Sequence, residues 1–171
     1  MRVHLSWVGV LACLIVLAGC GKRASESAAE KVIEAAIEKN AKGKAKVDLS
    51  KNKIEIKTDE GEFKMSSGGD VQIPAGFPKD VPLYKGAKAT VAMTQPKGFM
   101  LNLQTQDAVD KVAAAYASMM TGEGWEQEMS MDMGANKMLH YKKDKRIAHI
   151  TIAGSDTKNE TTISIVTATE N

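Results

Sequence analysis

WEQEMSMDMGANKMLHYKKDKRIAHITIA, residues 125–153, decides the fold of this chain, because apolar and polar side chains alternate through most of it. Alternation with a period of two is typical of half-buried β-strands. Gly134-Ala135-Asn136 and Asp144-Lys145 interrupt the pattern with residues that favour turns. The stretch therefore predicts three antiparallel strands joined by two tight hairpins.

The first hairpin allows two registers. A three-residue loop at Gly134-Ala135-Asn136 pairs each methionine of the first strand with a residue of the second: Met133 with Lys137, Met131 with Leu139 and Met129 with Tyr141. A four-residue loop instead aligns Met131 with His140 and places methionine and histidine side chains on one face. We favour the three-residue loop, because Leu139 and Tyr141 then have apolar partners across the strands. The methionines are accordingly expected to fill a core beneath a helix.

The second hairpin predicts a pair of histidines. A two-residue turn at Asp144-Lys145 sets His140 opposite His149 on the solvent-facing side of the sheet. Imidazole nitrogen binds zinc and copper, and thioether sulfur suits Cu(I). His140 and His149 are therefore the candidate metal ligands, with Met138 and Asp132 as possible additional ligands.

The segments on both sides of this stretch complete an α+β domain over residues 87–168. Asp107 and Asp110 are expected to cap a helix whose apolar positions recur with helical spacing through Met120. Strands are predicted at 89–94 and 99–104 before this helix, and at 161–168 near the end of the chain. This order predicts an antiparallel sheet with one helix across a face.

A smaller helix-plus-β-meander unit is predicted over residues 26–67. Ser27 with Glu30 forms a capping-box pattern, which indicates a helix that ends near Asn40 to Gly43. Short alternating runs follow it: Val47 with Leu49, Ile54 with Ile56, and Phe63 with Met65. A Pro- and Gly-rich linker, residues 68–86, joins this unit to the larger domain.

The predicted N-terminal helix has an apolar face made by Val32, Ile33, Ala36 and Ile37. An isolated helix of this length is marginal in water. We expect the face to dock within the chain, and the alternative is that it binds a partner or a membrane surface.

Residues 1–19 have the pattern of a secretory signal, with a positive charge followed by a short aliphatic run. Leu17-Ala18-Gly19-Cys20 closes that run and resembles the lipobox of bacterial lipoproteins. The resemblance implies cleavage between Gly19 and Cys20, diacylglyceryl and N-acyl lipid on Cys20, and a lipidated tether over residues 20–25. It implies a cell-membrane location, and Gly21 favours the outer membrane, facing the periplasm, in a Gram-negative cell. The alternative is an ordinary secretory signal, with Cys20 a free thiol.

The C-terminal part of the chain carries a second, looser resemblance. Phe77-Pro78-Lys79-Asp80-Val81-Pro82, the helix around Tyr116 and Gly124-Trp125 resemble a domain that recurs in small bacterial lipoproteins of uncharacterised function. This resemblance covers roughly residues 70–168. It implies no catalytic residues and no cofactor besides the lipid.

Composition and motifs favour a binding or structural module over an enzyme. The sequence contains no dinucleotide fingerprint, phosphate loop, zinc-protease helix or hydrolase elbow. The formal net charge of +2 offers little attraction to nucleic acid. We therefore expect a non-enzymatic, lipid-anchored module that binds an envelope protein, polymer or lipid, and the alternative is a periplasmic copper- or zinc-binding lipoprotein using His140 and His149.

Overall fold

The computed structural model describes residues 22–41, 44–58, 61–69, 71–155 and 159–170. They form one nine-stranded antiparallel sheet with the strand order β1-β2-β3-β4-β5-β9-β8-β7-β6. The helices are α1 (Lys22–Ala41) and α2 (Val109–Gly122), with a single 3-10 turn at Leu49–Lys51. The strands are β1 (Lys44–Asp48), β2 (Lys53–Thr58), β3 (Gly61–Ser67), β4 (Lys88–Gln95), β5 (Gly98–Thr105), β6 (Glu126–Asp132), β7 (Asn136–Lys143), β8 (Arg146–Gly154) and β9 (Thr161–Thr169).

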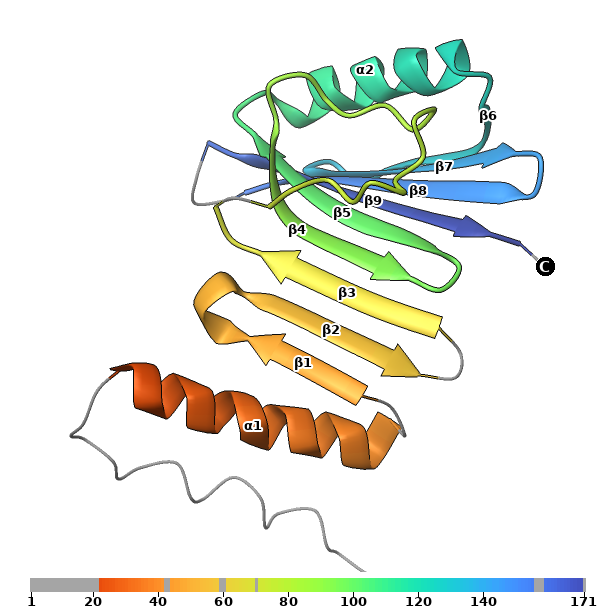
Figure 1. Ribbon diagram of the computed structural model, residues 1–171. Coiled ribbons are helices and arrows are strands. Elements are labelled where there is room, and N and C mark those ends of the chain that lie inside the picture. The colour runs from red at the N-terminus through yellow and green to blue at the C-terminus, as the bar shows by residue number, and fades with distance from the viewer. Residues whose placement is uncertain (1–21, 42–43, 59–60, 70, 156–158, 171) are drawn as a thin grey trace, which may run out of the picture.

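The α+β architecture is confirmed, with one helix across a face of the sheet (Figure 1). We call the face covered by α2 the inner face and the opposite one the outer face. Strands β1–β3 continue the sheet beyond β4, because Met65 of β3 pairs with Met93 of β4. The predicted meander is therefore hydrogen-bonded to the larger domain edge to edge.

The core lies between α2 and the strands beneath it. Tyr116 and Met120 of α2 are fully buried against the inner face. The fully buried inner-face residues include Leu101, Tyr141, Ile150, Ile152, Ile163 and Ile165. The predicted linker adds to this core, because Phe77, Val81 and Tyr84 are also buried. We call residues 71–87 the strap, since they arch over the inner face between β3 and β4 (Figure 1).

The second hairpin has the predicted register. His140 pairs with His149, and Leu139 pairs with Ile150. The turn between β7 and β8 places Asp144 at φ 55°, in the left-handed region that aspartate tolerates in tight turns.

The predicted register of the first hairpin is wrong by one residue, and the methionines do not fill the core. Met131 pairs with Met138, and Met129 pairs with His140. The connection is tighter than predicted, since Met133 N–H donates to Asn136 O across Gly134 and Ala135, with Gly134 at φ 73°. One residue of slip moves every side chain to the other face. Met129 and Met131 are accordingly each 44% exposed on the outer face.

Asp107 and Asp110 do not cap α2 as predicted. Ala108 is the N-cap, and no side chain caps the helix there. The Asp107 carboxylate instead accepts a 2.7 Å hydrogen bond from the Tyr84 hydroxyl, which ties the strap to the start of α2. Asp110 forms an ion pair with Lys137 of β7, with 2.9 Å between carboxylate oxygen and Nζ.

Helix α1 lies beside β1 at one edge of the sheet (Figure 1). Its glutamates face that strand. Backbone N–H groups of Val47 and Leu49 donate to the carboxylates of Glu34 and Glu30 at 2.7 and 2.8 Å. Glu30 and Glu34 therefore occupy the side of α1 that faces β1. Val32 and Ile33 lie elsewhere on the helix and are 70% and 36% exposed. The expected docking of this apolar face is therefore wrong for Val32 and Ile33. Neither α1 nor α2, the helices of the described ranges, has the length and hydropathy needed to cross a membrane.

The carboxylates of α1 should protect the amides of β1 from hydrogen exchange. Replacing Glu34 with alanine removes the acceptor of the Val47 amide, and a hydrogen bond to a charged group contributes about 1.5–3 kcal/mol. We expect the Val47 amide to exchange roughly tenfold to a hundredfold faster in Glu34→Ala, measured by NMR.

Two further variants serve as controls for this measurement. Glu34→Gln keeps an acceptor and should retain most of the protection. Glu38→Ala should affect the Ala45 amide more weakly, because that contact is 3.4 Å long. Unchanged exchange at Val47 in Glu34→Ala would mean that the helix does not hold this edge in solution.

Candidate functional site

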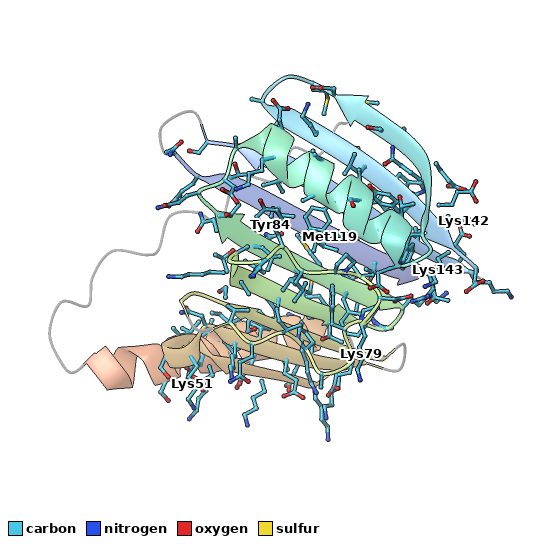
Figure 2. All side chains as sticks on the ribbon, turned by 90° about the horizontal axis from the view of Figure 1, so that it is seen from above. Lys51, Lys79, Tyr84, Met119, Lys142 and Lys143 are labelled. Carbon is cyan, nitrogen blue, oxygen red and sulfur yellow. The ribbon has the colours of Figure 1, made fainter. Side chains whose placement is uncertain are left out.

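The space between α2 and the sheet is filled by side chains. Val112, Tyr116 and Met120 project from the helix and are fully buried. Tyr84 of the strap belongs to this core and Met119 of α2 packs against it (both labelled in Figure 2). The rings of Tyr84 and Tyr116 stack with centroids 6.3 Å apart. This region is a packed core, and the candidate binding sites lie on the surface.

An open groove lies on the inner face over β1–β4, beside the strap. Its volume is about 920 Å³. Charged and polar side chains form its floor, including Lys46, Lys53, Glu55, Lys64 and Ser66. The strap residues Val71, Ile73, Pro74 and Ala75 form an apolar wall. The groove thus combines one apolar side with a floor of mixed charge.

The strap is fixed near its middle by Asp80. Its carboxylate accepts two hydrogen bonds from the Arg146 guanidinium, at 2.8 and 2.7 Å, and a third from Lys143 Nζ at 2.8 Å. Trp125 Nε1 donates to the Asp80 carbonyl at 2.7 Å, and the Arg146 guanidinium lies 5.0 Å from the centre of the Trp125 ring. Lys143 also donates to Glu123 O, beside the C-terminal end of α2 (Figure 2). This cluster joins strap, sheet and helix.

The Asp80 cluster predicts a loss of stability in acid. The Arg146 guanidinium, and after it the Lys143 ammonium, hold the pKa of Asp80 well below its usual range, although partial burial opposes them. The charged carboxylate therefore stabilises the fold fully above its unfolded-state pKa of about 3.9. That contribution should disappear as the pH falls from about 4 through the lower folded-state value.

Urea unfolding of the parent and Asp80→Asn between pH 2 and pH 7 tests this. We expect the variant to be less stable at pH 7 and the two proteins to converge toward pH 2. Parallel curves over the whole range would show that Asp80 does not contribute to the acid sensitivity.

The two predicted histidines meet on the outer face. His140 Nδ1 and His149 Nδ1 are 2.8 Å apart, and the ring centroids are 4.1 Å apart. The Glu128 carboxylate lies 3.1 Å from His140 Nε2. Because a carboxylate accepts the Nε2 proton, His140 Nδ1 is left as the acceptor and His149 Nδ1 as the donor. Burial lowers the pKa of the His149 imidazole, and the proximity of His140 lowers it further.

The other predicted ligands are divided between the two faces. Met138 lies on the same face as His140, two residues along β7. Asp132 pairs with Lys137 instead and forms an ion pair with it, toward the α2 side. Within the described ranges, no group of three or more His, Cys, Asp and Glu side chains is arranged to hold a metal ion. The predicted lipidation and cleavage residues, Cys20 and Gly19, lie outside the described residues.

Sequence reasoning missed Glu128 and the position of Met129. The register of β6 against β7 shifts between Gln127 and Met129, so Glu128 is the extra residue of a β-bulge. Bulges redirect side chains and are common on edge strands, and β6 is an edge strand. A run of polar residues before the methionines is compatible with a bulge but does not locate it.

Comparison with known proteins gives one family match. Residues 87–167 match the model of a family described as START domain-like. The match covers slightly less than half of the chain and includes β4 through most of β9 together with α2. No curated protein and no solved structure matched the chain.

Proposed function

We propose that this chain is a lipid-anchored binding module of a bacterial envelope, with no catalytic activity. The START domain-like match supports a binding role for residues 87–167. The resemblance of Leu17-Ala18-Gly19-Cys20 to a lipobox supports the anchor, and Gly21 favours the outer membrane, facing the periplasm, in a Gram-negative cell. Two or three acyl chains on Cys20 would hold the protein stably at the membrane, whereas one chain would not.

The proposed binding role rests on the groove beside the strap. It is open to solvent and presents an apolar wall, with Ile73 36% exposed, above a floor of lysines and Glu55. Exposed apolar side chains beside polar ones are typical of surfaces that bind a partner. An envelope protein, polymer or lipid with both apolar and polar groups would fit this surface.

Membrane fractionation tests the anchor. The full-length chain and Cys20→Ser are expressed in a bacterial host, and the mature N-terminus is weighed by mass spectrometry. We expect an acylated Cys20 in the membrane fraction and an unmodified product in Cys20→Ser. A soluble, unmodified parent would overturn the anchor and restore the alternative of an ordinary secretory signal.

Photo-crosslinking tests the groove. A photoreactive residue replaces Ser66 in the groove or, as a control, Ser118 on the exposed side of α2. We expect one dominant envelope species to be crosslinked from position 66 and not from position 118. The same products from both positions, or none from position 66, would refute the groove as the binding site.

A second function, metal binding, is favoured by a separate observation, the contact between His140 and His149. It uses the opposite face of the sheet and depends on neither the anchor nor the groove.

A further inference from the structure

On the outer face near β6, methionine side chains lie beside the histidine pair. The pairing of β6, β7 and β8 places Met129, His140 and His149 in one row across three strands. Met131 and Met138 form the next row on the same face, because they lie two residues along from Met129 and His140. Adjacent side chains on one face of a sheet are about 4.5–5.5 Å apart at Cβ.

The methionines of β6 are accessible, which is unusual for a solvent-facing surface. Met129 and Met131 are each 44% exposed, whereas the side chain of His140 beside them is 15% exposed. Methionine normally fills cores, yet here α2 covers the opposite face. Packing inside this fold therefore does not account for the two methionines of β6.

Glu128 prepares His140 to act as a ligand. Histidines that bind metals almost always donate their second ring N–H to a carboxylate, a carbonyl or water. The 3.1 Å contact from His140 Nε2 to Glu128 is of this kind and leaves the Nδ1 lone pair directed at His149. Movement of the His149 proton from Nδ1 to Nε2 would present two nitrogen lone pairs to one ion. Metal–nitrogen bonds of about 2.0–2.1 Å need the two rings to separate slightly from their 2.8 Å contact.

We propose that His140, His149 and Met129 form a binding site for Cu(I), with Met131 and Met138 as neighbouring thioether donors. Thioether sulfur is a soft ligand that selects Cu(I), and imidazole binds copper well. Zn²⁺ is bound by thiolate, imidazole and carboxylate. Within the part of the chain that the structure describes, Glu128 is the one carboxylate in contact with the histidine pair, and it is occupied by His140 Nε2. The soft methionines therefore favour Cu(I) over Zn²⁺ at this site.

Competition with a chromophoric Cu(I) chelator under anaerobic, reducing conditions tests the proposal on the full-length chain in detergent. We expect the parent to withdraw one equivalent of Cu(I), and His140→Ala/His149→Ala to withdraw none. Met129→Leu/Met131→Leu should weaken Cu(I) binding while leaving any weak Zn²⁺ binding unchanged. Glu128→Gln should weaken it about tenfold, as expected for loss of a residue that orients a ligand.

Matched controls make the result specific. Met93→Leu alters a methionine of β4, far along the same sheet, and should bind Cu(I) like the parent. Circular dichroism of each variant establishes that the fold is retained. Equal Cu(I) binding by the parent and the double histidine variant would overturn the site, as would a parent that withdraws no Cu(I). Methionine variants that bind Cu(I) as tightly as the parent would overturn the thioether ligands.

Discussion

Trp125→Ala is expected to lower the free energy of unfolding by about 4 kcal/mol, the range for deleting a large buried aromatic side chain being about 3–5 kcal/mol. Trp125 is 3% exposed and belongs to the core. The substitution also removes the hydrogen bond to the Asp80 carbonyl and the aromatic face beneath the Arg146 guanidinium. The strap would lose its hydrogen bond to the indole, and the Arg146 side chain of the sheet would lose its aromatic contact. Urea unfolding followed by circular dichroism measures the effect.

Trp125→Phe separates packing from hydrogen bonding. It keeps an aromatic ring but leaves the Asp80 carbonyl without its donor, so we expect a smaller loss of about 1–3 kcal/mol. A Trp125→Ala protein within about 1 kcal/mol of the parent would contradict the buried position of the indole, since core truncations of this size cost more.

Gly98→Ala is expected to destabilise the fold by about 3 kcal/mol, as overpacking does when backbone must move. Gly98 begins β5 and pairs with Ala168 of β9. A Cβ atom at this position would lie 1.9 Å from the Thr167 carbonyl oxygen and 3.0 Å from the Ala168 Cα. Both obstacles are backbone atoms, so no side-chain rotation relieves the clash. The ladder between β5 and β9 would have to open locally.

Gly122→Ala provides the matched control. Gly122 is the last residue of α2, and a Cβ there would meet no atom within 4 Å. Alanine in a helix is favoured over glycine by about 0.5–1 kcal/mol, so this variant should be slightly more stable than the parent. Chemical unfolding of both variants under the same conditions provides the comparison. Equal stabilities for the two would show that β5 and β9 do not approach as closely as described.

The alternating pattern of residues 125–153 was sufficient to predict the strands and the second hairpin. A tight turn at Asp144-Lys145 pairs apolar Leu139 with apolar Ile150, so the pattern favours one register. It was insufficient for the first hairpin. Met129 and Met131 are apolar, so a rule that faces apolar residues inward assigns them to the core. The rule failed because β6 is an edge strand whose inner-face position opposite Leu139 is occupied by Ser130.

Helix α1 shows a second limit of pattern reasoning. Helical spacing correctly placed Val32 and Ile33 on one face of the helix. It did not indicate that the opposite row of glutamates would be the side in contact with β1. That row accepts hydrogen bonds from the backbone N–H groups of Val47, in β1, and of Leu49, in the 3-10 turn after it. Such groups attract carboxylates because a strand at a sheet edge has no neighbouring carbonyls on that side. In the candidate copper site, the histidine pair and Met138 were predicted, whereas the positions of Met129 and Met131 depended on the register of the first hairpin.

The continuity of the sheet fixes how far the two ends of the molecule stand from each other. Strands in a sheet are about 4.8 Å apart, so β1 and β6, at opposite ends of the nine-strand order, are separated by roughly 40 Å. In the proposed lipoprotein one residue, Gly21, separates the acylated Cys20 from α1, which lies along β1. The sheet would then act as a spacer, because it separates the methionines and histidines near β6 from the anchored edge by a length comparable to the thickness of a bilayer.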